Sequence, residues 1–372
     1  MDFFHFNSSI FKKQPHDGYL GNFTACHVGN SLDQSIRYNS SSGGIISSLL
    51  ILALKKKMID GAILTKLNSA TLLPQVMIAR TPSEIISASG SKYCPVPVNS
   101  AIKQILSEKG KFALVGLPCH IHGVRMFEEA FPALRKKIPL LLGLFCSHTV
   151  NFHGTEYVLD RMGIRKEDIS VFFYRGGGWP GKPSAVLKNG QVVTDSRGKW
   201  NEMFGARFFT PMRCMLCIDA TNELADISFG DPWLPRFKNE KIGKSIVVCR
   251  TERGDELLKE AIAQKAIALE SISDSEVRLS QGSLRYKKRI VNAMTRLCFP
   301  HKDVPRYDCF RLSPSALDYF ISLLFLLNVE LSSRRSMIGL LNKWSRFIKL
   351  ARARTRKNPD LPLQHRPTEE SA

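Results

Sequence analysis

Four cysteines have the spacing that most clearly predicts chemistry in this chain. Cys214 and Cys217 form a C-x-x-C pair, which can place two sulfurs on one soft metal ion or one cluster. A tetrahedral site needs two more ligands. Cys119 and Cys146 are the candidates, because each follows a short apolar stretch typical of a buried strand. Four thiolates suit either zinc or an iron–sulfur cluster, and the spacing alone does not separate the two.

Three histidines stand beside the candidate cysteines and keep zinc open as an alternative. They are His120, His122 and His148, which are also candidate proton donors and so candidate catalytic residues. Two cysteines after separate strands plus a distant C-x-x-C pair differ from the compact two-knuckle arrangement of structural zinc sites. Reduced cysteines without a metal are a further alternative, and we expect that state for Cys249, which lies within an apolar strand.

A loop of serine and glycine opens the first strongly apolar helix of the chain. Ser41, Ser42, Gly43 and Gly44 precede apolar residues at helical spacing over residues 45–54. The first N–H groups of a helix have no partner within it, and the helix dipole favours an anion there. The loop therefore predicts either a phosphate cradle for a nucleotide cofactor or a well-capped helix start, since serine and glycine are common at that position.

Helices that alternate with short apolar strands are expected to position these residues. Residues 112–116 and 140–145 are predicted strands, and they end shortly before Cys119 and Cys146. This pattern indicates an α/β fold whose mainly parallel or mixed sheet is covered by helices. Open sheets of this kind bind ligands beyond the carboxyl ends of their strands. The two cysteines are therefore expected at one edge of the sheet.

The chain is expected to divide into four parts. Residues 1–35 contain turn formers without a clear period and predict an irregular N-terminal arm. Residues 36–270 predict the main domain, with a cysteine-bearing α+β extension that includes an Asn-Gly hairpin signal at 189–190. Residues 271–358 predict a helical basic C-terminal region, and residues 359–372 predict a disordered tail.

A net charge of +20 over 372 residues indicates an anionic partner such as nucleic acid, a phosphate-rich cofactor or a membrane surface. No recognised base-reading motif accompanies the charge, so specific nucleic-acid binding is not expected. No secretory signal pattern opens the chain, and the nine cysteines are accordingly expected in a reducing cytoplasm.

The C-terminal region contains an apolar stretch and then a basic amphipathic pattern. Residues 319–331 are apolar but shorter than the roughly 20 residues of a membrane span. Residues 340–351 place apolar side chains on one helical face among many Lys and Arg residues. The pattern predicts either peripheral contact with the inner face of an anionic membrane or a helix that docks on the protein core.

The chain also carries eight short motifs in a fixed order between residues 40 and 254. They are Ser40-Ser41-Ser42-Gly43-Gly44, Gly90-Ser91-Lys92-Tyr93, Gly116 to Arg125, Phe145-Cys146-Ser147-His148, Arg175 to Trp179, Arg213 to Cys217, Ala225-Asp226-Ile227 with Gly230-Asp231, and Gly243-Lys244-Ser245. Taken together, these motifs resemble the coenzyme F420 hydrogenase/dehydrogenase beta-subunit family. Each motif is weak alone, and the shared order makes the resemblance specific.

The resemblance implies an oxidoreductase subunit in which residues 36–270 carry FAD and a 4Fe–4S cluster. It implies cluster ligation by Cys119, Cys146, Cys214 and Cys217. It implies flavin contacts by Ser41, Ser42, Gly43, Gly44, Lys92, Arg125, Gly177 and Asp231. Many relatives begin with a ferredoxin-like run of cysteines, whereas this chain has only Cys26 and Cys94 before Cys119. At most one cluster is therefore expected.

The implied activity is electron transfer between a two-electron donor of deazaflavin or nicotinamide type, FAD, the cluster and an unidentified acceptor. An electron donor or acceptor protein and a homo- or hetero-oligomer are the expected partners. Some family members accompany surface polysaccharide synthesis, a membrane-proximal setting that suits the basic tail. The alternative function is a non-catalytic accessory protein, zinc-binding or metal-free, that binds a membrane or a partner through that tail.

Overall fold

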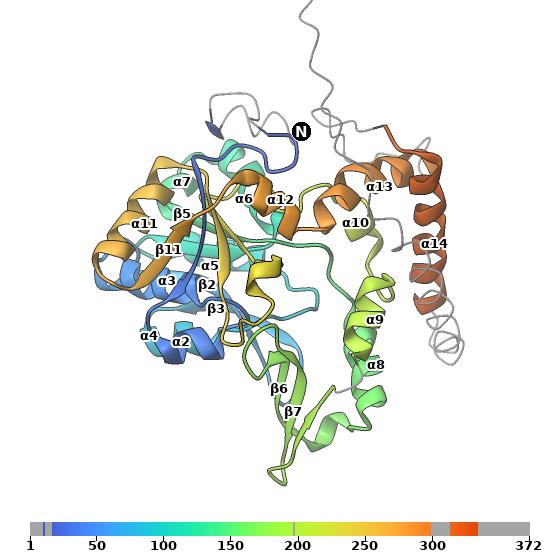
Figure 1. The fold of residues 1–372 in the computed structure, drawn as a ribbon. Helices are drawn as coiled ribbons and strands as arrows, with labels where there is room; N and C mark the ends of the chain where they lie inside the picture. The colour runs from blue at the N-terminus through green and yellow to red at the C-terminus, as the bar shows by residue number, and fades with distance from the viewer. Residues whose placement is uncertain (1–9, 12–16, 196–197, 299–312, 334–372) are drawn as a thin grey trace, which may run out of the picture.

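A mixed sheet of eight strands forms the centre of the molecule (Figure 1). The computed structural model describes residues 10–11, 17–195, 198–298 and 313–333. The strands are β1 Ala25–Ser31, β2 Gly61–Leu67, β3 Pro74–Ala79, β4 Phe112–Gly116, β5 Leu140–Leu144, β9 Ile227–Gly230, β10 Ser245–Cys249 and β11 Ile267–Ser271. They lie in the order β11-β1-β10-β9-β5-β4-β2-β3. The predicted α/β fold is confirmed.

The middle of the sheet is parallel and its edges are antiparallel. Strands β2, β4, β5 and β9 run parallel to one another, whereas β3, β10, β1 and β11 pair antiparallel with their neighbours. The apolar runs predicted as strands over residues 112–116 and 140–145 form β4 and β5. Because three parallel strands end at Gly116, Leu144 and Gly230, the segments that follow them meet at one edge of the sheet.

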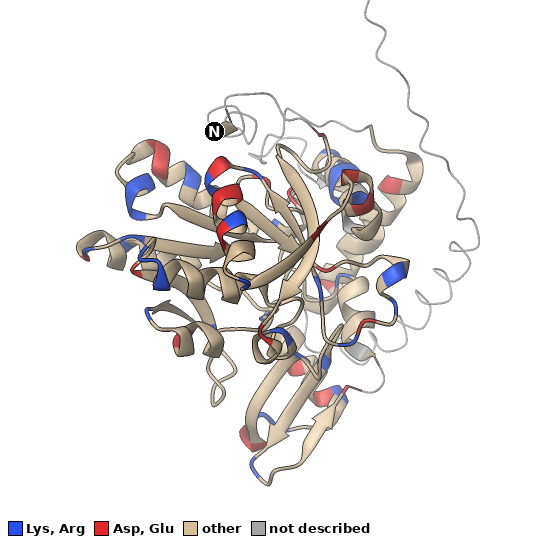
Figure 2. Cartoon of the chain, turned by 60° about the vertical axis from the view of Figure 1, so that its left-hand side comes forward, with Lys and Arg blue, Asp and Glu red and all other residues tan. Residues whose placement is uncertain are grey.

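Helices cover both faces of this sheet. They are α2 Gln34–Asn39, α3 Ile45–Lys55, α4 Pro82–Ser87, α5 Ala101–Ser107, α6 Pro118–Ala130, α7 Leu134–Lys137, α11 Glu252–Ala263 and α12 Asp274–Ser280. Successive strand residues point to opposite faces, so Ala113 packs with α3 and α11 while Leu114 packs with α5 and α6. Burial on both sides explains why the strands are apolar without alternation. Figure 2 shows that most charged side chains lie on the helices and loops rather than on these strands.

Strand β1 differs from the sequence prediction. Residues 25–31 belong to the predicted irregular arm, but they form a strand between β10 and β11. The segment lacks a period-two pattern because most of its side chains are buried, polar Asn30 and Ser31 included. Its strand conformation depends on antiparallel pairing with segments more than 200 residues away, which local sequence does not encode.

A smaller α+β unit extends from the sheet, but unlike the predicted cysteine-bearing extension it contains no cysteine between residues 152 and 205. It contains α8 Phe152–Met162, the strands β6 Ile169–Gly176, β7 Lys182–Leu187 and β8 Val192–Thr194, and α9 Lys199–Gly205. Its three-stranded antiparallel sheet has the order β6-β7-β8, and the predicted Asn-Gly hairpin joins β7 to β8. An aromatic core that includes Tyr174, Trp200 and Phe209 holds this unit together.

The last described helices pack together at one side of the molecule (Figure 1). They are α13 Ser283–Cys298 and α14 Ala316–Ser333, which contact each other and the short helix α10 Met212–Met215. Met215 packs against Ile290 and Met294 of α13, so α13 covers the segment that carries the C-x-x-C pair. The predicted basic amphipathic pattern at 340–351 and the predicted disordered tail at 359–372 lie outside the described residues.

Candidate functional site

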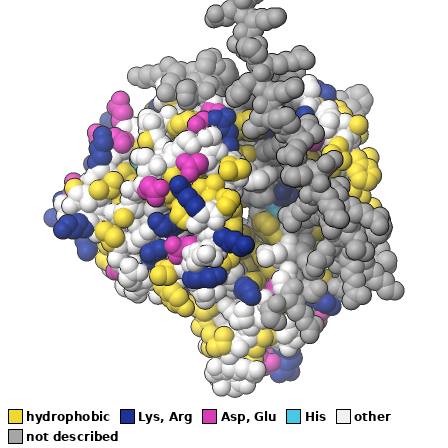
Figure 3. Space-filling model, in the orientation of Figure 1, with side chains coloured by type: hydrophobic (Ala, Val, Ile, Leu, Met, Phe, Trp, Pro, Cys, Tyr) yellow, Lys and Arg dark blue, Asp and Glu magenta, His cyan; other side chains and the backbone are white. Residues whose placement is uncertain are grey.

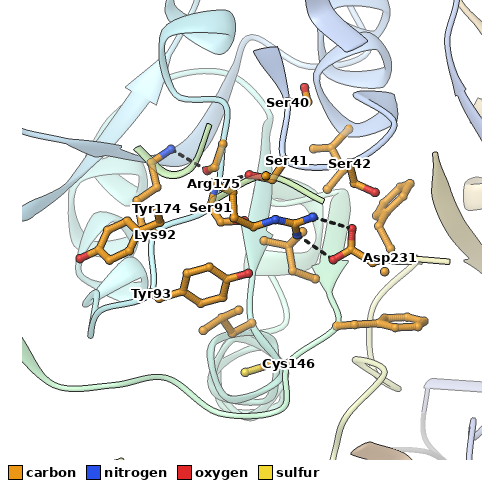
Figure 4. Close-up of a pocket in the computed structure, with 18 of the residues that line it drawn as sticks. Ser40, Ser41, Ser42, Ser91, Lys92, Tyr93, Cys146, Tyr174, Arg175 and Asp231 are labelled. Atoms are coloured by element: carbon orange, nitrogen blue, oxygen red, sulfur yellow. Dashed lines mark hydrogen bonds and ion pairs between the residues drawn. The ribbon is translucent and has the colours of Figure 1, made fainter. Parts of the chain in front are cut away.

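A cavity of about 700 Å³ lies at the carboxyl ends of β4, β5 and β9. Gly116, Leu144 and Gly230, the last residues of these strands, line it together with the start of α3 and residues 88–94. The volume falls within the range of small-molecule and cofactor sites. Figure 4 shows residues of the loop before α3, of the segments that follow β5 and β9, and of the smaller unit arranged around this cavity. The cavity is therefore where the strand pattern predicts a ligand.

The serine and glycine loop forms part of the cavity wall. Ser41, Ser42 and Gly44 line the cavity, and Gly44 adopts a left-handed conformation (φ 75°) immediately before α3. The Ser41 hydroxyl accepts a hydrogen bond of 2.7 Å from the Ser91 N–H. Gly43 does not line the cavity: its N–H donates to Ser245 Oγ at 2.8 Å, and a Cβ there would lie 2.6 Å from a backbone oxygen. The wall presents the first N–H groups of α3 toward any ligand.

Lys92 lines the cavity, but its ammonium group is already engaged. Its Nζ donates hydrogen bonds to the backbone carbonyls of Ala88, Ser89 and Gly90 at 2.5, 2.8 and 2.9 Å. These carbonyls follow the end of α4, where a cation is favourable. Burial lowers the pKa of Lys92 to about 8. The side chain therefore closes the loop beside the cavity and contributes a positive charge without a free donor.

A buried ion pair joins the smaller unit to the large sheet beside the cavity. Arg175 donates from Nη1 and Nη2 to the carboxylate of Asp231 at 2.7 and 3.1 Å (Figure 4). Trp179 Nε1 also donates to that carboxylate at 2.9 Å, and Trp179 stacks on Trp233 with ring centroids 5.0 Å apart. The nearby carboxylate raises the pKa of Arg175. Asp231 thus lines the cavity with its oxygens already bound.

Besides Gly43, two more residues implied as flavin contacts lie outside the cavity wall. Gly177 is in the left-handed turn after β6 (φ 77°) and does not line the cavity. Arg125 is buried on α6, where Nε donates to Leu224 O at 3.0 Å and Nη1 donates to Glu128 at 2.9 Å. Arg125 therefore ties α6 to the segment before β9.

The three candidate histidines occupy different positions. His120 and His148 line the cavity, whereas His122 does not. Burial, with a smaller effect of Arg213, lowers the pKa of His120 to about 4. His148 is 4% exposed and stacks on Phe204 with ring centroids 3.8 Å apart. Its Nε2 is buried and has no hydrogen-bond partner within the described residues.

The four candidate cysteines come together beside the cavity. Cys119 stands at the start of α6, Cys146 follows β5, Cys214 is on α10 and Cys217 follows it. Burial raises the pKa of the Cys119 thiol to about 11 although the residue as a whole is exposed, and Cys217 and Cys214 raise it further. Burial likewise raises the pKa of Cys146, and the other three cysteines add to the effect. Cys146 also lines the cavity, so the cysteine group adjoins the cavity wall.

A buried lysine stands among these thiols. Lys287 on α13 is 1% exposed, and its Nζ donates to Asp219 O at 3.1 Å. Its pKa is raised despite burial, because Cys217, Cys146 and Cys214 favour its charged form. Sequence reasoning missed this residue, since Lys287 belongs to a basic run over 285–289 in which no local signal separates an inward side chain from a solvated one.

Four cysteine thiols near a buried ammonium form a donor set of the kind that iron–sulfur clusters use. Across the described ranges, no three His, Cys, Asp or Glu side chains are grouped closely enough to hold one metal ion. Tetrahedral zinc with Zn–S distances near 2.3 Å would require sulfurs roughly 3.8 Å apart. An iron–sulfur cluster is larger and binds its thiolates farther apart, and its negative charge suits the ammonium of Lys287.

Comparison with known proteins identifies what the chain is similar to. The family model for the N-terminal part of the coenzyme F420 hydrogenase/dehydrogenase beta subunit matches residues 26–103, and the model for the C-terminal part matches residues 109–275. The chain is 25% identical over 260 residues to the coenzyme F420 hydrogenase subunit beta of Methanococcus voltae, covering 68% of this chain and 87% of that protein.

Two further similarities concern a longer enzyme and a solved structure. The chain is 26% identical over 263 residues to a coenzyme F420-dependent sulfite reductase of Methanocaldococcus jannaschii, covering 67% of this chain and 38% of that protein. A chain in the structure of the F420-reducing NiFe hydrogenase complex from Methanosarcina barkeri aligns with a TM-score of 0.60 at 24% identity. That alignment covers 73% of this chain and 90% of the other, and it supports the fold.

Proposed function

The chain belongs to the coenzyme F420 hydrogenase/dehydrogenase beta-subunit family of oxidoreductases, and from this premise we propose that it passes electrons between a two-electron donor, FAD and one 4Fe–4S cluster. The observation that carries the proposal is the position of Cys146, which belongs both to the cavity wall and to the cysteine group. A ligand in the cavity and a cluster on the four thiols would then be direct neighbours.

The chain's own residues support this assignment in distinct ways. The start of α3 offers backbone N–H groups for a diphosphate, and His148 contributes to the cavity wall. Cys119, Cys146, Cys214 and Cys217 would hold the cluster, and Lys287 would balance part of its negative charge. A bound flavin accepts two electrons together and releases them singly, which makes a one-electron cluster its suitable neighbour.

We propose the electron donor and the redox partner from the names of the relatives. Relatives are named as coenzyme F420 hydrogenase subunits, so we expect a deazaflavin or nicotinamide-type donor and a second redox protein in a complex. An association with surface polysaccharide synthesis stays a prediction from the basic tail. The competing accessory function with a single zinc ion is less favoured, because the described side chains form no group close enough for one ion.

The visible spectrum and metal content of the full-length protein, purified without oxygen, test the proposal. We expect flavin absorbance with a broad iron–sulfur band, about four irons per chain and no stoichiometric zinc. Reconstitution with iron, sulfide and FAD is the second arm for a preparation that has lost its cofactors. A protein that holds neither iron nor flavin after reconstitution, or that holds one zinc instead, would refute the proposed function.

A further inference from the structure

Helix α14 exposes four large apolar side chains and buries three polar ones. Leu317, Phe320, Leu323 and Leu327 are 59%, 58%, 55% and 43% exposed, and they recur every three or four residues along one face. The buried positions of α14 are Ser322, Phe325, Asn328 and Ser332. A helix on the surface of a globular protein normally shows the opposite pattern. The reversed pattern indicates that the outer face meets an apolar environment.

Hydrogen bonds fix this orientation of the helix. Asn328 Nδ2 donates to Ala206 O at 2.8 Å, and Ser332 Oγ accepts from the Phe209 N–H at 2.7 Å. Phe325, one turn before Asn328, packs with Met215, Ile290 and Met294. Turning the leucine face inward would break buried polar contacts, each of which is costly to leave unpaired. The outward leucines are therefore a stable property of the fold.

The helix lies along the protein rather than leaving it. It is long and apolar enough to cross a membrane by length and composition, with 18 residues and a mean hydropathy of 1.4. However, its contacts with α13 and with residues 206–209 extend over more than two turns. Hydrophobic side chains reach the right-hand edge of Figure 3, where α14 lies in Figure 1. An apolar stripe on a helix held in this way suits a membrane surface.

Charge in the adjoining sequence identifies the kind of surface. Residues 334–358 follow α14 directly and contain nine Lys and Arg residues with no Asp or Glu. Lys and Arg residues beside an apolar stripe favour anionic lipid headgroups, by about 1 kcal/mol for each residue near the surface. A protein partner that covered the stripe would not require this concentration of positive charge. The combination therefore favours lipid over protein as the occupant.

We propose that the exposed face of α14, formed by Leu317, Phe320, Leu323 and Leu327, docks the protein on an anionic lipid membrane. The apolar side chains would enter the boundary between headgroups and acyl chains, while the basic residues that follow would contact the headgroups. This inference is independent of the cofactors. It would hold the redox site at a membrane surface without a spanning segment.

Flotation with lipid vesicles tests the proposal on the full-length protein. Wild-type protein is expected to float with vesicles of phosphatidylglycerol and phosphatidylcholine, and several-fold less with phosphatidylcholine alone or in about 0.5 M salt. The combined variant Leu317→Gln, Phe320→Gln and Leu323→Gln should lose most of the binding to anionic vesicles. Circular dichroism and thermal unfolding check that the variant is folded.

A matched control separates this face from hydrophobicity in general. Leu106, Phe131 and Leu279 are 51%, 56% and 71% exposed on other elements. Leu106→Gln, Phe131→Gln and Leu279→Gln together should leave vesicle binding unchanged. Equal binding by wild type and the α14 variant would overturn the proposal, because the basic segment alone would then suffice. Wild-type protein that ignores vesicles, or whose α14 face proves by light scattering and crosslinking to join two copies, would also overturn it.

Discussion

The cavity wall and the cysteine group adjoin each other at Cys146 but differ in how their polar groups are satisfied. In the wall, the Lys92 ammonium already has three carbonyl partners, and Arg175 and Asp231 already bind each other. In the cysteine group, Cys146, Cys214 and Cys217 favour the charged form of Lys287, whose Nζ donates to the Asp219 carbonyl. The charged groups of the wall are thus paired within the protein, whereas the thiols of the cysteine group are the ligands that we propose for a cluster.

This difference implies that the wall and the cysteine group contribute to ligand binding in different ways. A wall whose charges are already paired would recognise a ligand by its shape and by backbone N–H groups. A group of thiols beside a buried ammonium gains its stabilisation on binding an anionic cluster. Substitutions in the wall should therefore appear mainly as changes in folding stability, and substitutions in the cysteine group mainly as changes in metal content.

The largest effect is expected from the cysteine group. Cys119→Ser and Cys217→Ser should each lose most of the iron of the anaerobically purified protein, because a hydroxyl is a much poorer ligand for iron than a thiolate. Iron analysis per chain measures the change. Cys249→Ser is the matched control, since Cys249 is buried in β10 away from the cavity, and it should keep its iron. Equal iron in the three variants would contradict the assignment of the ligands.

The buried ion pair of the wall should give the next largest effect, seen in stability. Asp231→Ala leaves the Arg175 guanidinium uncompensated at a site where the two side chains are only 10% and 17% exposed. The free energy of unfolding in urea should fall by about 3 kcal/mol.

A second Arg–Asp pair in the same chain provides the control. Arg165 also binds Asp168 through two nitrogens, but these side chains are 73% and 42% exposed. Asp168→Ala should lower the free energy of unfolding far less than Asp231→Ala, because solvent screens the pair. Equal losses in the two variants would show that the wall is not held by this ion pair.

The smallest effect concerns the pH dependence contributed by Lys92. Its pKa in the folded protein is about 8, below the ordinary lysine value near 10.5. Between these two pH values, Lys92 is protonated more often in the unfolded chain than in the folded protein. The contribution of Lys92 to the free energy of unfolding therefore rises with pH, by at most about 1.4 kcal/mol per pH unit.

Lys92→Met should remove that rise. Urea unfolding of wild type and variant between pH 7.5 and 9.5 or so measures it as a stability difference that grows toward the alkaline end in favour of wild type. A difference that is constant with pH would show that Lys92 titrates normally in the folded protein.

The parallel centre of the fold could be predicted from sequence, because buried parallel strands are continuous apolar runs. Strands β4 and β5 were expected from residues 112–116 and 140–145, and their ends place Cys119 and Cys146 on one edge. Strand β1 could not be predicted, since its partners are distant in the chain. It was also easier to predict which residues gather at the site than which hydrogen bonds they make. The sequence around Lys92 does not show that its side chain closes a loop, and the sequence around Lys287 does not show that its side chain faces the thiols.

The position of Lys287 bears on the order in which the protein is assembled. All four thiols precede α13 in the chain, and α13 then covers the C-x-x-C segment through Ile290 and Met294. A chain made from its N-terminus presents the complete ligand set before the covering helix exists. Insertion of the proposed cluster would thus be easiest in a nascent or partly open protein. Packing of α13 would then bring the Lys287 ammonium next to the negatively charged cluster. Packing of α13 against the C-x-x-C segment would then be most favourable when the proposed cluster is already bound.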